Sequence, residues 1–186
     1  MIGAIAVTGA RERKLAWFAF TKKAQIRNVA LLEFKHLTKV LQDTSGVPPG
    51  FFNDPYVVGF LSGYTMGVGF HVGGKGVKAS DVTSALTEVL FQLVPNDARS
   101  VAQRYREWEA AHEPAFDAGQ ESGTLLALYA YKAARLDNDP IVLEARVKAE
   151  RMAPIWDKLH QNPDDHSRMM SALRQMLFWD KIEHLK

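Results

Sequence analysis

The sequence predicts an all-α protein, and three observations support this prediction. Apolar residues recur at helical spacing along most of the chain. Short segments with proline, glycine and capping residues separate these stretches. No stretch alternates between apolar and polar residues strongly enough to require a sheet, and residues 64–72 come nearest to doing so. We expect a single domain over residues 1–186, an irregular bundle of about six helices around a glycine-rich central helix.

The first predicted helix runs from about Arg11 to Gln42. Its inward face is formed by apolar residues at helical spacing, namely Ile26, Ala30, Phe34, Leu37 and Leu41. The segment 44–50 ends this helix, because its two prolines and two glycines do not continue a helix.

The next segment, residues 55–76, has no charged residue before Lys75, and Gly59, Gly63 and Gly67 recur at every fourth position. On a helix these glycines form one stripe, which lets another backbone approach closely. The stripe therefore predicts a tight helix–helix contact, and we expect the protein to associate with itself through this face.

Capping residues mark the later helices. Ser80 or Asp81 is expected to begin a helix that ends at Pro95, and Asn96 or Asp97 one that ends near His112. A further helix is predicted over residues 114–136. Asp139-Pro140 and Asn162-Pro163 each place a cap before a first-turn proline, which predicts helices over 140–160 and 163–184. Pro154 is expected to kink or split the first of these two.

Composition excludes several classes of protein. A chain of 186 residues with 47% hydrophobic and 24% charged residues is typical of a globular protein with a sizeable core. The absence of cysteine excludes disulfides, thiolate metal sites and a cysteine nucleophile. The N-terminus has its apolar residues before its charges, unlike a signal peptide, so we expect a cytoplasmic protein.

The charge is distributed unevenly. The first 40 residues contain eight basic and two acidic residues, a balance of +6, whereas the whole chain has a net charge of +2. Such a segment can bind an anionic surface or partner. The basic residues are scattered around the helix and do not form a stripe, so a solvated surface is the preferred interpretation, and a nucleic-acid partner is not expected.

The most suggestive chemical pattern is Glu-x-x-His, which occurs at Glu33–His36 and at Glu109–His112, with a related Asp157–His160. This spacing places the carboxylate and the imidazole on one face of a helix. Two such pairs on facing helices can hold two iron or manganese ions. The alternative is an ordinary buried acid, hydrogen-bonded to a tyrosine, tryptophan or arginine.

Other patterns are weaker. Asp180 and His184, with His166 on the same side of the last predicted helix, form a reserve metal or acid–base set. Residues 69–76 resemble a phosphate-binding loop, but Gly76 stands where a magnesium-binding hydroxyl is needed. No serine has the context of a nucleophile. Residues 55–74 are long enough to cross a membrane, but polar and small residues make lipid insertion unfavourable.

The sequence therefore favours a non-enzymatic interaction or assembly protein, with itself or another protein as partner and with no cofactor. The main alternative is a metal-dependent helical-bundle enzyme, with iron or manganese held by Glu33, His36, Glu109 and His112. Binding of an anionic surface by residues 1–40 is a third hypothesis, and membrane association is less favoured than a buried helix.

Overall fold

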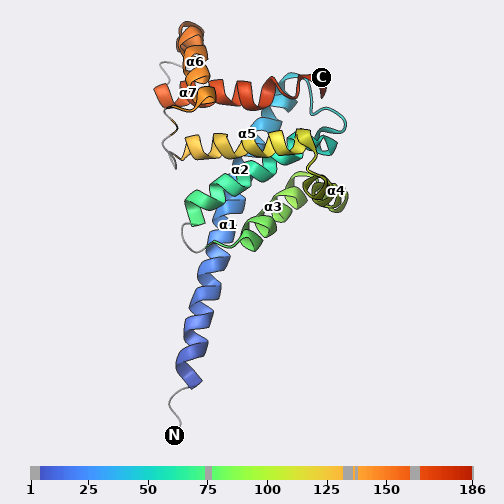
Figure 1. Ribbon diagram of the computed structural model, residues 1–186, viewed down its shortest axis with the longest axis vertical. Coiled ribbons are helices and arrows are strands. Elements are labelled where there is room, and N and C mark those ends of the chain that lie inside the picture. Colours follow the sequence, from blue (N-terminus) through green and yellow to red (C-terminus); the bar gives the residue numbers. More distant parts are fainter. Residues whose placement is uncertain (1–4, 74–76, 132–135, 137, 160–163, 186) are drawn as a thin grey trace.

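The computed structural model describes residues 5–73, 77–131, 136, 138–159 and 164–185, and it describes the side chains of these residues except at 5–21, 73 and 152–159. This part of the chain contains seven α-helices and no strands, so the all-α prediction is confirmed. The helices are α1 (Ile5–Thr44), α2 (Pro55–Gly73), α3 (Ala79–Leu93), α4 (Ala98–Ala111), α5 (Pro114–Ala130), α6 (Pro140–Leu159) and α7 (Asp165–Arg174). Figure 1 shows α2, α3 and α5 beside the C-terminal half of α1, with α6 and α7 at the opposite end from the N-terminus.

The predicted caps agree with the structure at two helix starts. Asp97 precedes α4, and the Asp139 carboxylate accepts hydrogen bonds from the backbone of Ile141 and Val142 at the start of α6. At α3 the predicted cap, Ser80 or Asp81, lies two or three residues after the observed one, which is Lys78. The helix begins at Ala79, and Asp81 instead accepts a hydrogen bond from the backbone N–H of Lys78 at 3.0 Å.

Two helices end earlier than predicted. Helix α5 ends at Ala130. Helix α7 ends at Arg174, and a π-helical turn over Gln175–Trp179 follows it directly. The wider turn keeps both Leu177 and Phe178 in the core. Helix α6 is not split at Pro154. Asn162-Pro163 lies outside the described residues, and Asp164 caps α7 through the backbone of Ser167.

One hydrophobic core joins all seven helices of the described part. Phe178 lies near its centre, with its ring 4.8 Å from that of Phe60, 6.2 Å from Phe51 and 6.4 Å from Phe34. These rings come from α1, α2, the short 3₁₀ turn Phe51–Asn53 and the π-helical turn. Tilted and edge-to-face aromatic pairs add to the free energy gained by burial. The C-terminal segment is therefore part of the core.

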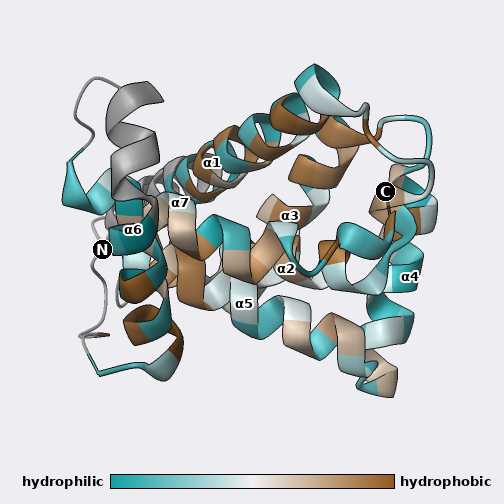
Figure 2. Ribbon diagram, turned by 90° about the horizontal axis from the view of Figure 1, so that it is seen from above, coloured by the Kyte–Doolittle hydropathy of each residue, from teal (hydrophilic) through white to brown (hydrophobic). Residues whose placement is uncertain are grey.

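Helix α2 lies in the middle of the molecule. Every residue from Tyr56 to Thr65 is buried, so the helix has no polar face. A helix that is apolar on all sides is stable in water only when other helices surround it. In Figure 2, α2 lies between α1 and α5, with α3 and α4 nearby. Among the described residues, no helix is long and apolar enough to cross a membrane.

Helices α2 and α5 are in direct backbone contact. A Cβ atom on Gly59 would lie 2.2 Å from the carbonyl oxygen of Phe116, and one on Gly63 would lie 1.9 Å from that of Gln120. The contact is reciprocal, because a Cβ on Gly123 would lie 2.1 Å from the carbonyl oxygen of Phe60. The helices approach this closely only because both carry glycine at the crossing.

Side chains fix the register of this crossing. Gln120 on α5 donates a hydrogen bond to the Ser62 hydroxyl at 3.1 Å. Thr124 donates one to the carbonyl oxygen of Gly63, also at 3.1 Å. Polar side chains buried at this crossing therefore keep hydrogen-bond partners, which replace the water that burial removes.

The predicted tight contact of Gly59, Gly63 and Gly67 thus lies within one chain. Gly67 also faces α5, where an added Cβ would lie 2.6 Å from that of Ala127. A second copy of the chain needs an open glycine face in order to pack on this stripe, and α5 already covers that face. The sequence pattern identifies the packing surface but not the chain that occupies it.

The remaining helices enclose this pair. Helix α3 lies against α1, where Glu88 pairs with Lys23 at 2.5 Å and with Arg27 at 3.1 Å. Burial of Glu88 opposes ionisation, but hydrogen bonds from the two cations outweigh it and lower the pKa of Glu88. Glu88 therefore neutralises part of the basic charge of α1.

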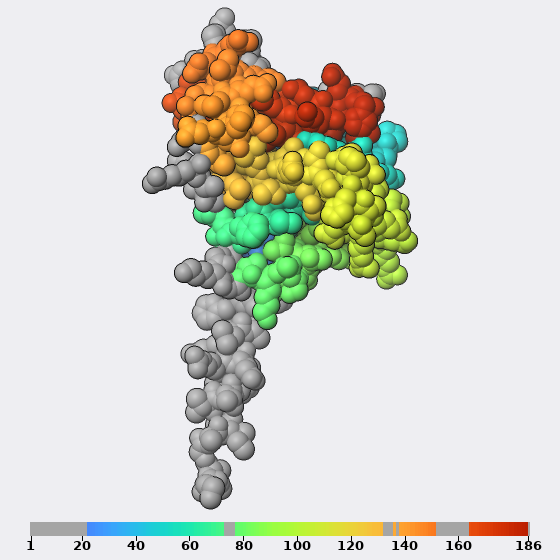
Figure 3. Space-filling view, viewed as in Figure 1, coloured from blue at the N-terminus to red at the C-terminus, as the bar shows by residue number. Residues whose placement is uncertain are grey.

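Helices α6 and α7 cover the C-terminal end of α5 (Figure 3).

We expect Gly63→Ala to destabilise the fold. Alanine stabilises a helix interior by about 1 kcal/mol relative to glycine, so helix propensity alone predicts a more stable protein. The added Cβ would instead collide with the backbone of Gln120. We expect the free energy of unfolding to fall by at least about 2 kcal/mol, and the Tm measured by calorimetry to fall by roughly 4–8 °C.

The matched control is Gly69→Ala on the same helix. Its Cβ would meet the end of the Val82 side chain at 2.8 Å, not a backbone atom. Displacing this methyl group costs less than displacing backbone, and the higher helix propensity of alanine offsets part of the cost, so we expect a change within about 1 kcal/mol of zero. Equal Tm values for the two variants would contradict the crossing described above.

We expect Tyr56→Phe to weaken the attachment of the C-terminal segment. The Tyr56 hydroxyl donates to the carbonyl oxygen of Leu177 at 2.5 Å, and the variant leaves this carbonyl without that donor. The loss should lower the free energy of unfolding at pH 8 by about 1–3 kcal/mol, as measured by urea titration.

The same variant should change the alkaline pH dependence. Burial raises the pKa of Tyr56 to about 12, whereas a tyrosine in the unfolded chain loses its proton near pH 10. Stability from this group is complete below about pH 10 and is lost as the pH rises toward 12. Tyr56→Phe should therefore lose less stability than the wild type between pH 9 and pH 11.5. Parallel curves would show that Tyr56 titrates normally.

Candidate functional site

A polar cleft of about 670 Å³ opens between α1, α2, α5 and α7. We define the polar cleft by its lining residues: Glu33 and His36 from α1, Tyr64 from α2, Ala130 and Tyr131 at the end of α5, and His166, Ser167, Arg168, Met170, Ser171 and Arg174 from α7. Its volume is within the range of cavities that hold small organic molecules. It combines several titratable groups from four separate helices.

The centre of the cleft is an ion pair. Arg174 donates from Nε to one Glu33 oxygen at 2.6 Å and from Nη2 to the other at 2.8 Å. The Glu33 side chain is 9% exposed and that of Arg174 is 22% exposed. Burial alone would lower the pKa of Arg174, but its hydrogen bonds to Glu33 and their mutual attraction outweigh burial and raise it. The two-pronged geometry fixes the plane of the guanidinium.

Tyr64 brings a phenol from the central helix to the cleft. Burial raises the pKa of Tyr64 well above its ordinary value, and the nearby Glu33 carboxylate raises it further. The pKa of Tyr131 is also raised, for the same two reasons. Both phenols are therefore protonated at neutral pH. They can donate hydrogen bonds to a ligand.

Among the histidines that the structure describes, three lie in or beside the polar cleft. His36 is exposed at its edge. His166 stacks on Tyr129, with ring centroids 5.7 Å apart and planes 8° apart. His71, at the end of α2, stacks on Tyr131 at 4.7 Å. Two histidines thus line the cleft, and the third supports one of its aromatic walls.

The charge of the lining is positive. Among the described residues that line the cleft, Glu33 carries negative charge and Arg168 and Arg174 carry positive charge. Arg168 also contacts Asp165 at 3.2 Å. The lining residues therefore carry a formal charge of +1, part of which the Asp165 carboxylate beside Arg168 offsets.

The predicted metal ligands do not form one site. Glu33 and His36 line the polar cleft, but Glu109 lies beside a different pocket and accepts a hydrogen bond from Tyr105 at 2.8 Å. His112 ends α4 in a left-handed conformation, with φ 50° and a side chain that is 85% exposed. Within the part of the chain that the structure describes, no three acidic or histidine side chains gather closely enough to hold a metal ion.

The reserve residues are also separated. Asp180 accepts hydrogen bonds from Lys148 at 3.0 Å and from Gln175 at 2.5 Å. His184 instead faces Asp54, with Nε2 2.9 Å from a carboxylate oxygen. The π-helical turn between α7 and these residues removes the alignment that a continuous helix would give. Asp157–His160 lies outside the residues whose side chains are described.

The sequence indicates one half of the ion pair. A buried acid hydrogen-bonded to an arginine is the alternative interpretation of the Glu33–His36 pattern, and Glu33 is bonded in this way. The other half, Arg174, lies 141 residues away in the sequence, and no local pattern connects the two residues. Tyr64 and Tyr131 also gave no signal, because aromatic residues at helical spacing usually belong to the core.

Comparison with known proteins does not assign this cleft to a class. No model of a protein family, no curated protein sequence and no solved structure matches the chain.

Proposed function

We propose that this protein is a non-enzymatic binding protein that holds a small organic anion, such as a phosphate ester or a carboxylate, in the polar cleft. The observation that carries the proposal is Arg174, whose guanidinium is held by Glu33 at the lining of a cleft of about 670 Å³. An arginine held in a fixed orientation recognises phosphate and carboxylate groups well, because little conformational entropy remains to be lost on binding.

The walls of the cleft suit an organic anion better than an inorganic one. Tyr131 and Met170 offer apolar surface, while Ser167 and Ser171 offer hydroxyl groups. Small-molecule sites usually combine such a surface with a few polar groups that fix orientation. The ligand is expected to place its anionic group near Arg174 and its carbon skeleton against Tyr131.

The groups in the cleft favour binding over catalysis. Both oxygens of Glu33 accept hydrogen bonds from Arg174, so this carboxylate is poorly placed to remove a proton from a substrate. Because the pKa of Tyr64 is raised, its phenol stays protonated at neutral pH and does not act as a base toward a substrate. A metal-dependent reaction would need ligands that the described residues do not bring together. These features favour a binding protein whose partner is a small molecule.

Self-association remains a prediction, but it requires another surface. The glycine stripe is covered by α5, whereas Leu143 and Val147, one turn apart on α6, are 43% and 47% exposed. Scattered exposed apolar residues are normal in monomeric proteins. We therefore base the functional proposal on the polar cleft.

The proposal is tested with phenyl phosphate as the probe and with two variants of opposite expected effect. Glu33→Gln keeps the size of the side chain and removes the negative charge that neutralises Arg174. It should tighten phenyl phosphate binding severalfold. Replacing both residues, Glu33→Gln with Arg174→Gln, removes the cation without leaving Glu33 unpaired, and should weaken binding at least tenfold, about 1.4 kcal/mol. Isothermal titration calorimetry measures both affinities.

The control variant is Arg99→Gln, which removes an exposed arginine on α4 away from the cleft. It should leave the affinity unchanged. NMR signals of His36 and His166 should shift with phenyl phosphate, and benzyl alcohol, which has the ring but no charge, should not shift them. An affinity that falls equally in Glu33→Gln and in the double variant would contradict the proposal, since it would indicate general damage to the cleft.

A further inference from the structure

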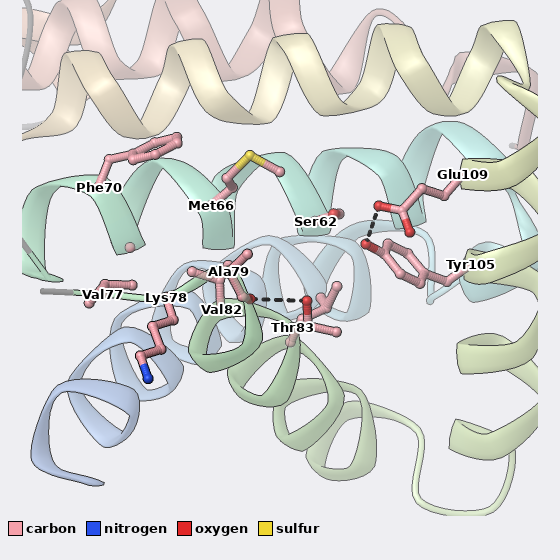
Figure 4. Close-up of a pocket in the computed structure, with 12 residues that line it drawn as sticks. Ser62, Met66, Phe70, Val77, Lys78, Ala79, Val82, Thr83, Tyr105 and Glu109 are labelled. Atoms are coloured by element: carbon pink, nitrogen blue, oxygen red, sulfur yellow. Dashed lines mark hydrogen bonds between the residues drawn. The ribbon is translucent and has the colours of Figure 1, made fainter. Parts of the chain in front are cut away.

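A second cavity lies between α2, α3 and α4 and is separate from the polar cleft (Figure 4). We call it the apolar pocket; its volume is about 250 Å³. Helix α2 contributes Ser62, Met66, Gly69 and Phe70; the N-terminal part of α3 and the two residues before it contribute Val77, Lys78, Ala79, Val82, Thr83 and Leu86; and α4 contributes Tyr105 and Glu109. Most of this surface is apolar, which suits a hydrocarbon or aromatic group.

One end of the apolar pocket is polar. Tyr105 donates a hydrogen bond to Oε1 of Glu109 at 2.8 Å, and Ser62 lies at the same end (Figure 4). Gln120 on α5 donates to the Ser62 hydroxyl oxygen at 3.1 Å, which fixes Ser62 from behind. The polar end is thus held in place by residues of three helices.

The Glu109 carboxylate has capacity for a further donor. A carboxylate accepts up to about four hydrogen bonds, and Tyr105 supplies one of them. Burial, together with the hydrogen bond to Glu109, raises the pKa of Tyr105 to about 12, so the phenol remains a donor at neutral pH. A ligand group that meets this end must therefore donate hydrogen bonds, and a positive charge on it would be attracted to Glu109.

The other charged group does not compete for this end. Lys78 lies at the opposite side of the apolar pocket, and in Figure 4 its ammonium points away from Met66 and Phe70. Lys78 and Glu109 are both exposed, but the Glu109 carboxylate is held at the polar end by its hydrogen bond from Tyr105. A ligand whose apolar body lies against Met66 and Phe70 therefore places its polar group beside Glu109 and not beside the Lys78 ammonium. This placement favours a positive charge on the ligand.

We propose that the apolar pocket binds a primary amine with a short apolar body, with its ammonium at Glu109 and its hydrocarbon or ring against Met66, Phe70 and Val82. The volume corresponds to about eight water molecules at about 30 Å³ each. A ligand of about eight to ten non-hydrogen atoms therefore fits, and 2-phenylethylamine is a suitable probe. This site is distinct from the anion-binding cleft, so either proposal can fail without the other.

The test compares three probes that share one ring and differ in charge: 2-phenylethylamine, 2-phenylethanol and phenylacetate. Binding is followed by NMR of protein labelled with ¹³C at the methionine methyl groups, because Met66 lines the apolar pocket. The Met66 signal is assigned with Met66→Leu. We expect the amine to shift this signal with at least tenfold higher affinity than the alcohol, and phenylacetate to bind more weakly than either.

Two variants locate the interaction. Glu109→Gln keeps the shape and an acceptor for Tyr105, and it should reduce amine affinity at least tenfold while leaving the alcohol unchanged. The matched control, Glu107→Gln, removes an exposed carboxylate of α4 that does not line the apolar pocket, and should change neither. Ala79→Trp places a bulky ring at the mouth from an exposed position, and should block all three probes without lowering the Tm appreciably.

Several outcomes would overturn the proposal. Phenylacetate binding more tightly than the amine would assign the apolar pocket to anions that reach Lys78. Equal amine affinity in the wild type and in Glu109→Gln would show that the carboxylate plays no part. No shift of the Met66 signal by any probe at millimolar concentration would mean that the apolar pocket binds none of these ligands.

Discussion

The backbone contact between α2 and α5 is the constraint on which the other features depend. Five glycines allow it: Gly59, Gly63 and Gly67 on one helix and Gly119 and Gly123 on the other. Because α5 covers one side of α2, the rest of α2 is left to contact α1, α3 and α4. The central helix therefore contributes to both cavities, with Tyr64 in the polar cleft and Ser62 and Met66 in the apolar pocket.

The two cavities differ in the partner of their carboxylate. In the polar cleft, the Glu33 carboxylate is matched by Arg174, and the lining as a whole keeps a positive charge. In the apolar pocket, the Glu109 carboxylate meets a neutral phenol and no arginine among the described lining residues. A carboxylate paired with an arginine orients that arginine toward an anionic ligand. A carboxylate bonded only to a neutral phenol attracts a positively charged ligand. The same residue type thus favours ligands of opposite charge.

The C-terminal segment connects the core to the cleft. Arg174 is the last residue of α7, and the π-helical turn that follows places Leu177 and Phe178 in the core. Tyr56 holds this turn by a hydrogen bond to the Leu177 carbonyl oxygen. The position of the guanidinium therefore depends on aromatic packing several residues away. Stability of the core and geometry of the site are linked through this turn.

The sequence by itself determined the all-α class, most of the helix positions and the face on which α2 packs, because apolar periodicity, caps and glycine spacing are local signals. It also indicated that Glu33 needs a partner. Only the tertiary structure decided that α5 of the same chain fills the glycine stripe, that Arg174 is the partner of Glu33, and that Glu33 and Glu109 lie in different cavities. These outcomes depend on which helices touch, and helical periodicity gives the inward face of each helix but not the neighbour that it meets.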